Sequence, residues 1–201
     1  MSLTSTALFT PYFKYRVLNN TSITDSNSNF LESFTASVQI ESYEPFALLN
    51  YSKSYEGTNL GTYSLNYRNS KLNITAGHFY SQFGSGLVLR NWEDRQLGIN
   101  NALQGGKIVY DPVSFISLTA LYGKQRVGFT TSEGEIFGFN SELDAASIFD
   151  FKNTSLEIGL SYVGRKEETT FLEPSFNELT NSLSGRVDYY QNNFYSNAEY
   201  V

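Results

Sequence analysis

The sequence predicts an all-β fold: an antiparallel, up-and-down transmembrane β-barrel that is incomplete, with about 11 strands present in 201 residues. Three observations lead to this prediction. Polar and apolar residues alternate in short runs, tight polar turns separate these runs, and the connections between them are alternately short and long. We therefore interpret residues 1–201 as a single β-barrel domain.

The alternating runs are the expected strands. The run from Leu72 to Gly77 (LNITAG) is an example, because every second residue before the glycine is apolar. The expected strands cover residues 8–17, 34–41, 46–54, 63–68, 72–77, 107–110, 116–122, 143–151, 156–162, 186–189 and 194–201. An odd number of strands does not close a single-chain bacterial barrel, so we expect the chain to be a fragment of a longer protein.

The connections are the second observation. Short turns centre on Glu44, Asn69, Pro112, Asn153 and Asn192. Longer connections cover residues 19–32, 55–60, 81–104, 124–142 and 165–181. In an up-and-down barrel every second connection lies at the same rim, and outer-membrane barrels have short turns at one rim and long loops at the other. A soluble antiparallel sheet with one solvated face explains the alternation of side chains equally well, but not the alternation of loops.

The charged side chains fall on one face of the expected strands. A Lys or Arg facing lipid at the middle of a bilayer costs about 2–4 kcal/mol, so this distribution favours a polar lumen and an apolar exterior. We expect the following residues to face the lumen: Lys14, Arg16, Glu41, Arg68, Lys107, Glu157, Arg186 and Asp188.

Residues 82–104 are expected to form an irregular loop that bends into the lumen as a constriction. The segment contains Gly84, Gly86 and Gly98, which permit sharp bends. Irregular backbone at membrane depth is tolerated only where it faces protein or a water-filled cavity. The candidate pore residues are Arg90, Glu93, Asp94 and Arg95, because fixed charges along a narrow path set ion selectivity. The alternative is a salt-bridge cluster that only pins the loop.

Composition excludes several classes of function. The net charge of −6 and the pI near 4.8 argue against nucleic-acid binding. With no Cys and a single His, His78, the chain predicts no metal site, no cofactor and no catalytic group, so we do not expect an enzyme. We expect His78 at a rim or in an aromatic girdle. The first residues lack the pattern of a signal peptide.

The segment GHFYSQFGSGLVLRNWEDRQLG, followed by GGKIVYDP and LYGKQR, resembles a family of uncharacterised porin-like bacterial outer-membrane proteins. The resemblance is carried by the FGSGL turn and by the run Arg90, Glu93, Arg95, Leu97 and Gly98. It implies a bacterial outer-membrane location and a β-barrel architecture in contact with outer-membrane lipid. A lumen lined by polar and charged side chains leads to the hypothesis of a passive channel for small solutes or glycans. The alternative is a non-conducting structural or accessory barrel whose long loops bind a protein or glycan partner.

Overall fold

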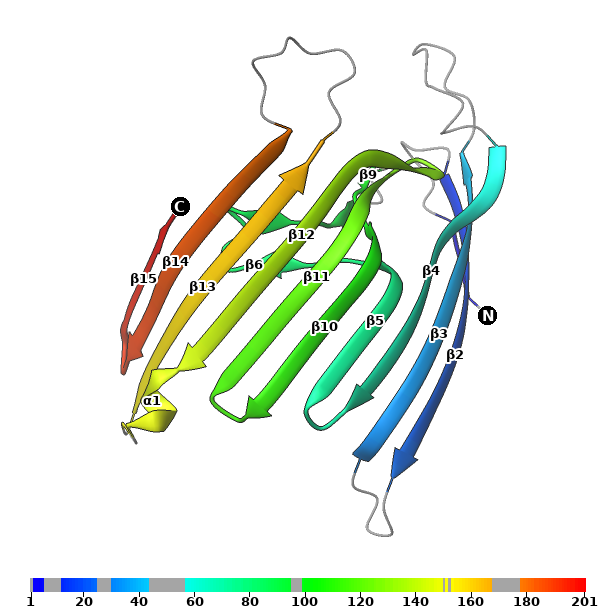
Figure 1. Cartoon of the computed structure of the whole chain (residues 1–201). Coiled ribbons are helices and arrows are strands. Elements are labelled where there is room, and N and C mark those ends of the chain that lie inside the picture. The colour runs from blue at the N-terminus through cyan, green and yellow to red at the C-terminus, as the bar shows by residue number, and fades with distance from the viewer. Residues whose placement is uncertain are drawn as a thin grey trace.

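A computed structural model describes residues 2–5, 12–24, 30–43, 57–94, 99–149, 151, 153–167 and 178–201. Its main element is a curved eleven-stranded sheet in which each strand pairs antiparallel with its neighbours along the chain (Figure 1). The strands are β1 (Ser2–Ser5), β2 (Tyr12–Thr24), β3 (Phe30–Tyr43), β4 (Gly57–Asn69), β5 (Leu72–Phe79), β10 (Leu103–Val113), β11 (Ile116–Val127), β12 (Thr130–Asp144), β13 (Thr154–Lys166), β14 (Leu179–Gln191) and β15 (Phe194–Tyr200). The expected all-β fold and antiparallel nearest-neighbour pairing are confirmed. Within the described residues, β1 and β15 are the two edges of the sheet.

Asparagines form several of the tight turns. After β4, the Asn69 side-chain oxygen accepts hydrogen bonds from the backbone N–H groups of Lys71 and Leu72, at 2.9 and 2.8 Å. Asn153 and Asn192 have φ values of 61° and 53°, a conformation that asparagine tolerates better than most residues. The short turns expected at Asn69 and Asn192 are therefore confirmed. The short turn expected at Asn153 is wrong, because β12 ends at Asp144 and Asn153 closes a longer connection to β13.

The expected connection 124–142 and the expected strand 143–151 are wrong. β11 continues to Val127, the chain turns at Gly128 and Phe129, and β12 follows as the longest strand of the sheet. The strand ends at Asp144, where the helix α1 (Ala145–Ile148) begins. The Asp144 carboxylate accepts a hydrogen bond from the Ser147 N–H at 3.1 Å and caps this short helix.

Other expected boundaries also shift. β2 continues to Thr24 through part of the polar stretch expected as a loop, and β4 begins at Gly57, inside the expected connection 55–60. Pro112 lies inside β10 at a register shift between Tyr110 and Val113, a position that proline tolerates, and the turn follows it. The expected strand 46–54 lies outside the described residues. The described residues form eleven sheet strands, but two of them, β1 and β12, do not correspond to any expected strand, so the expected number of about 11 is not matched strand for strand.

Most connections keep the expected order at the two rims of the sheet. One rim carries the turns at 70–71, 114–115 and 192–193, whereas the long connection 80–102 leaves the other rim. Three exceptions stand out. The expected long connection 19–32 belongs to the rim of the long loops, but the end of β2 and the start of β3 lie at the rim of the short turns. The turn at 128–129 is short on the rim of the long connection, and the linker containing α1 is long on the rim of the turns.

The two faces of the sheet differ in polarity. We define the inner face as the one against which the described residues between β5 and β10, 80–94 and 99–102, pack, and the outer face as its opposite (Figure 1). One row of residues crosses eight strands on the outer face and contains only apolar or tyrosine side chains: Phe34, Tyr67, Ile74, Ile108, Ala120, Phe139, Tyr162 and Leu183. A neighbouring row on the inner face is almost entirely polar: Ser33, Arg68, Asn73, Val109, Thr119, Asn140, Ser161 and Ser184.

Burial follows the same division. Thr75, Asn140 and Ser161 are buried on the inner face, whereas Phe139, Ile158 and Leu160 are each more than 40% exposed on the outer face. The inner face also buries apolar side chains, such as Leu121 and Val163. The outer face differs from the solvated face of a sheet in a water-soluble protein, because its exposed side chains are largely apolar. No helix within the described ranges is long and apolar enough to cross a membrane.

Candidate functional site

The segment between β5 and β10 folds over the inner face of the sheet (Figure 1). It contains two small antiparallel pairs, β6 (Gln82–Phe83) with β7 (Leu89–Arg90), and β8 (Glu93–Asp94) with β9 (Ile99–Asn100). The turn between β6 and β7 uses Gly84 and Gly86, whose φ values are 53° and 95°. Other residues rarely adopt such backbone angles, so the glycines allow this sharp bend. We call residues 80–102 the internal segment.

An apolar cluster anchors the internal segment to the sheet. Phe83 and Leu89 are buried with residues of the inner face, namely Phe79, Leu103, Leu121, Ile136 and Val163. The Phe83 ring lies over Gly138 of β12, where an added Cβ would come within 2.8 Å of the ring. The glycine therefore provides the space that the ring occupies.

Hydrogen bonds hold the base of the internal segment. The Lys107 ammonium donates to the Tyr80 carbonyl at 2.9 Å, and the Tyr80 hydroxyl donates to the Asn100 side chain at 3.0 Å. Burial raises the pKa of Tyr80 above its usual value, and the nearby Glu93 carboxylate raises that pKa further. Tyr80 thus remains a neutral hydrogen-bond donor at physiological pH.

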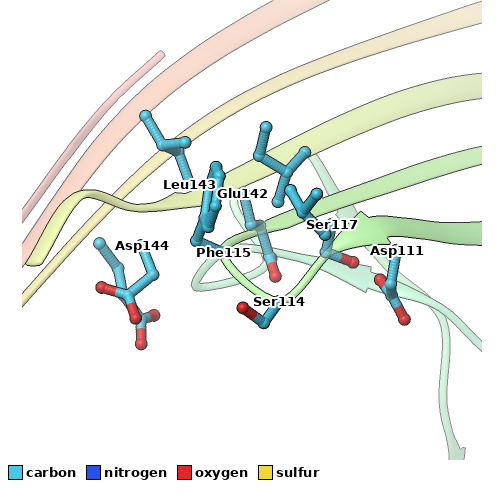
Figure 2. A pocket seen from close by; sticks show the side chains of 10 residues that line it. Asp111, Ser114, Phe115, Ser117, Glu142, Leu143 and Asp144 are labelled. Atoms are coloured by element: carbon cyan, nitrogen blue, oxygen red, sulfur yellow. The ribbon is translucent and has the colours of Figure 1, made fainter. Parts of the chain in front are cut away.

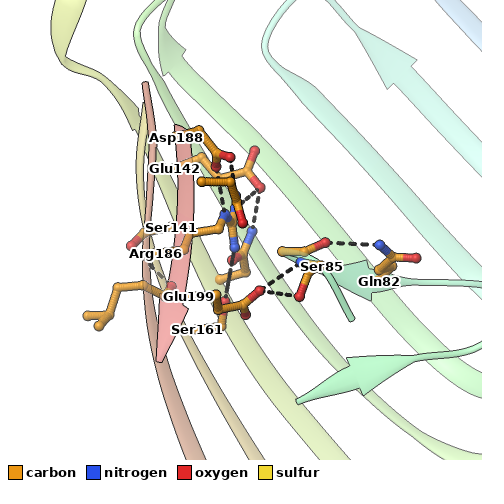
Figure 3. Close-up of polar contacts among 12 residues, drawn as sticks. Gln82, Ser85, Ser141, Glu142, Ser161, Arg186, Asp188 and Glu199 are labelled. Carbon is orange, nitrogen blue, oxygen red and sulfur yellow. Dashed lines mark hydrogen bonds and ion pairs between the residues drawn. The ribbon is translucent and has the colours of Figure 1, made fainter. Parts of the chain in front are cut away.

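The tip of the internal segment reaches the far end of the sheet (Figure 3). The Glu199 carboxylate on β15 accepts a hydrogen bond from the Ser85 N–H at 2.9 Å and another from the Ser85 hydroxyl. Arg186 of β14 lies beside Gly84, where an added Cβ would come within 2.7 Å of its guanidinium. The segment therefore crosses the inner face from β5 to β15.

Arg186 is the centre of a polar network on the inner face (Figure 3). Its guanidinium forms an ion pair with Glu142 at 2.5 Å and lies 4.0 Å from the Asp188 carboxylate. It also donates to the side chains of Asn140 and Ser161, each at 3.5 Å. These contacts fix the position of the positive charge and balance it with carboxylates.

A second ion pair connects strands that are not neighbours. The Arg126 guanidinium of β11 lies 2.5 Å from the Glu41 carboxylate of β3, and both side chains are almost completely buried. Three strands, β4, β5 and β10, stand between β3 and β11 in the sheet. The Arg126 N–H also donates to the carbonyl of Ala102 at 2.8 Å, at the end of the internal segment.

Three of the four candidate pore residues, Arg90, Glu93 and Asp94, lie in the described part of the internal segment. Arg90 is exposed on β7 and forms no ion pair within the described residues. Glu93 and Asp94 are half-buried on β8, and Arg95 lies outside the described residues. Residues 83–85 contact the wall at Gly138, Arg186 and Glu199.

The residues expected to face the lumen lie on the inner face wherever the structure describes their side chains. Arg68, Lys107, Glu157, Arg186, Asp188 and Glu41 belong to rows of the inner face. Lys14 and Arg16 lie opposite Glu41 and Gln39 in the ladder between β2 and β3, but their side chains lie outside what the structure describes. His78 belongs to the outer face, where its Nδ1 lies 3.2 Å from the Tyr63 backbone nitrogen and its ring meets the Tyr63 ring edge-on.

An acidic recess of about 340 Å³ lies at the rim of the short turns (Figure 2). Four carboxylates line it: Asp111, Glu142, Asp144 and Glu157. The described part of the chain contains no group of three or more His, Asp or Glu side chains arranged to hold a metal ion. The recess therefore contributes negative charge to this end of the inner face.

The sequence did not indicate the roles of Arg126, Glu142 and Glu199. The first two were assigned to a connection, which hid their strand alternation. Glu199 lies opposite Arg186 in the hairpin of β14 and β15, so the hairpin register alone places these two residues side by side. The contact of Glu199 with Ser85 depends on tertiary structure and leaves no signal in the sequence.

Comparison with known proteins gives one match. A model of a family described as "Family of unknown function (DUF6029)" matches residues 14–201. Neither the curated proteins nor the solved structures contain a match. The matched region covers almost the whole chain and includes both the internal segment and the strands that hold it, so the chain belongs to the DUF6029 family.

Proposed function

We propose that this chain forms part of the wall of a bacterial outer-membrane β-barrel whose lumen passes small polar solutes and is narrowed by the internal segment. The observation that carries the proposal is the difference in polarity between the two faces of the sheet. Its outer face exposes large apolar side chains, whereas its inner face combines buried polar side chains with the apolar cluster against which the internal segment packs. Lipid favours this arrangement because it solvates apolar side chains, whereas water on the inner side can solvate polar ones.

The dimensions of the strands support a membrane location. β13 has 13 residues, which at about 3.3 Å per residue give a length of about 40 Å. Tilted by about 40°, such a strand rises about 30 Å, which is the thickness of the hydrocarbon core. At the rim of the long connection, Lys124 and Glu135 form an ion pair 3.7 Å long next to the exposed Tyr122. Aromatic and charged side chains above an apolar band are typical of a membrane interface.

The internal segment supports a constricted passage rather than an open pore. It crosses the inner face and carries Arg90, Glu93 and Asp94 into the same space. The inner face adds fixed charges at Lys107 and Arg186. Solutes that pass this point would meet polar groups of both signs, which suits small hydrophilic molecules.

A second function is favoured by the packing of the same segment. Phe83 and Leu89 fill part of the inner face with apolar side chains, and the Glu41–Arg126 pair is closed to solvent. A barrel filled in this way would not conduct and would instead serve as a structural or accessory protein.

Cysteine labelling tests the membrane location. The chain has no native cysteine, so the thiol reagent can react only with the single cysteine that each substitution introduces. Ile158→Cys and Ile108→Cys on the outer face should react poorly with a water-soluble thiol reagent in lipid vesicles. Glu157→Cys and Asp111→Cys on the inner face should react readily. Equal labelling of the two sets would contradict the membrane location.

Conductance separates the two functions. The inserted full-length protein should conduct in planar bilayers, and replacing Arg90 and Arg95 together with Glu should shift its preference toward cations. Unchanged selectivity in a conducting double variant would mean that these residues do not set ion selectivity and only hold the loop in place. Complete absence of conductance in correctly inserted protein would favour the accessory barrel.

A further inference from the structure

A contact between residues far apart in the sequence connects the tip of the internal segment with β15, the last strand of the sheet. Ser85 and Glu199 are 114 residues apart, yet a single carboxylate oxygen of Glu199 accepts both the backbone N–H and the hydroxyl of Ser85 (Figure 3). Hydrogen bonds to an ionised carboxylate are stronger than those between neutral groups. This contact is therefore a specific attachment point.

Arg186 supplies the second half of the attachment. Its side chain is only 9% exposed, and Glu142, Asp188, Asn140 and Ser161 hold it from the strands around it. A guanidinium fixed in this way cannot move aside for a larger neighbour without breaking several contacts. The neighbouring position of the segment is Gly84, which presents no side chain to it.

We infer that Glu199 and Arg186 are positioning residues that clasp residues 84–85, so that the wall formed by β14 and β15 sets how far the internal segment closes the lumen. The consequence for solute passage rests on the proposed function, whereas the clasp itself does not. The segment then has two independent anchors, the Phe83 ring over Gly138 and the clasp at its tip. Removing the clasp should free the tip while the ring stays in place.

The two glycines of the turn provide a matched pair of variants. Both have positive φ, so alanine strains the backbone at either site. At Gly84 the new methyl group would approach the Arg186 guanidinium and the Glu199 carboxylate, at 2.7 and 2.9 Å. At Gly86 its nearest contacts would be with the Arg90 side chain of the same segment, the closest at 3.1 Å. Gly84→Ala therefore disturbs the clasp, and Gly86→Ala controls for backbone strain.

Distances between spin labels test the clasp in the full-length protein in lipid. One label is placed at Leu87→Cys, at the exposed tip of the segment, and the other at Leu183→Cys, on the outer face of β14. The parent should give one narrow distance. Loss of hydrogen bonds to a charged group should shift the balance between docked and undocked tips by roughly 10- to 100-fold in Glu199→Ala. Gly84→Ala should broaden the distance distribution in the same direction, and Gly86→Ala should leave it narrow.

Three results would overturn the inference: a narrow distance in Glu199→Ala, a narrow distance in Gly84→Ala, or equal broadening in the two glycine variants. Should Glu199→Ala fail to assemble, Glu199→Gln replaces it, because the amide keeps the shape of the side chain but loses its charge toward Arg186. The distances do not depend on conduction. A protein that never conducts would therefore refute the proposed channel and leave the clasp to be decided by the labels.

Discussion

Removing one partner of the Glu41–Arg126 pair should destabilise the protein strongly. Both side chains are at most 2% exposed and their charged atoms are 2.5 Å apart. Arg126→Met would leave the Glu41 charge buried without its partner, and breaking a buried ion pair in this way costs about 3–5 kcal/mol. The double variant Glu41→Leu with Arg126→Met removes both charges and should lie within about 1–2 kcal/mol of the parent.

Urea unfolding in lipid vesicles measures these free energies. The chain contains one tryptophan, Trp92, which lies in the internal segment and reports on its environment by fluorescence. Arg165→Met is the control, since Arg165 pairs with Glu167 at the surface and both side chains are about half exposed. That substitution should cost less than about 1 kcal/mol. If Arg126→Met costs no more than Arg165→Met, or if the double variant costs the sum of its two single variants, the reasoning from desolvation is refuted.

Three further predictions follow from the faces, the packing and the turns of the sheet. Ile158→Lys places a charge on the outer face and should reduce membrane insertion, at a cost of about 2–4 kcal/mol, whereas Glu157→Lys on the inner face should insert normally in a vesicle flotation assay. Gly138→Ala should lower the free energy of unfolding by about 1–3 kcal/mol because its methyl group meets the Phe83 ring, whereas Gly185→Ala, with no atom within 4 Å, should stay within about 0.5 kcal/mol. At Asn192, whose φ is 53°, valine should cost at least about 1 kcal/mol in urea unfolding and glycine should be tolerated; equal effects would contradict the assigned turn.

The sheet could be predicted from the sequence wherever each strand has a clear alternation and a recognisable turn. β5 meets both conditions, because apolar and polar residues alternate in it and the Asn69 turn precedes it. β15 meets the second condition, since the turn at Asn192 precedes it. Period-two alternation fixes the face of each side chain, so the inner-face rows followed from the same pattern.

β12 could not be predicted because its residues are adapted to tertiary contacts. Its inner face alternates apolar, small and polar residues, Ile136, Gly138 and Asn140, since the Phe83 ring occupies the space above the glycine. The glycines and glutamates of this stretch are typical of a loop, and the sequence alone does not show that the Phe83 ring packs against one of the glycines. Tertiary contacts also limited the prediction of the site. The sequence predicts Arg90 and Glu93 within a bent segment, but it does not predict the contact of Ser85 with Glu199.

The long sequence separation of two contacts has a consequence for the order of folding. Every pair of neighbours in the sheet is consecutive along the chain, apart from the internal segment between β5 and β10, so hairpins can form locally and quickly. Glu41 and Arg126 are 85 residues apart, and Ser85 and Glu199 are 114 apart. Closing such large loops costs entropy before any contact compensates for it. The internal segment should therefore reach its final position late, after β15 has joined the sheet, and the wall can assemble before its interior is filled.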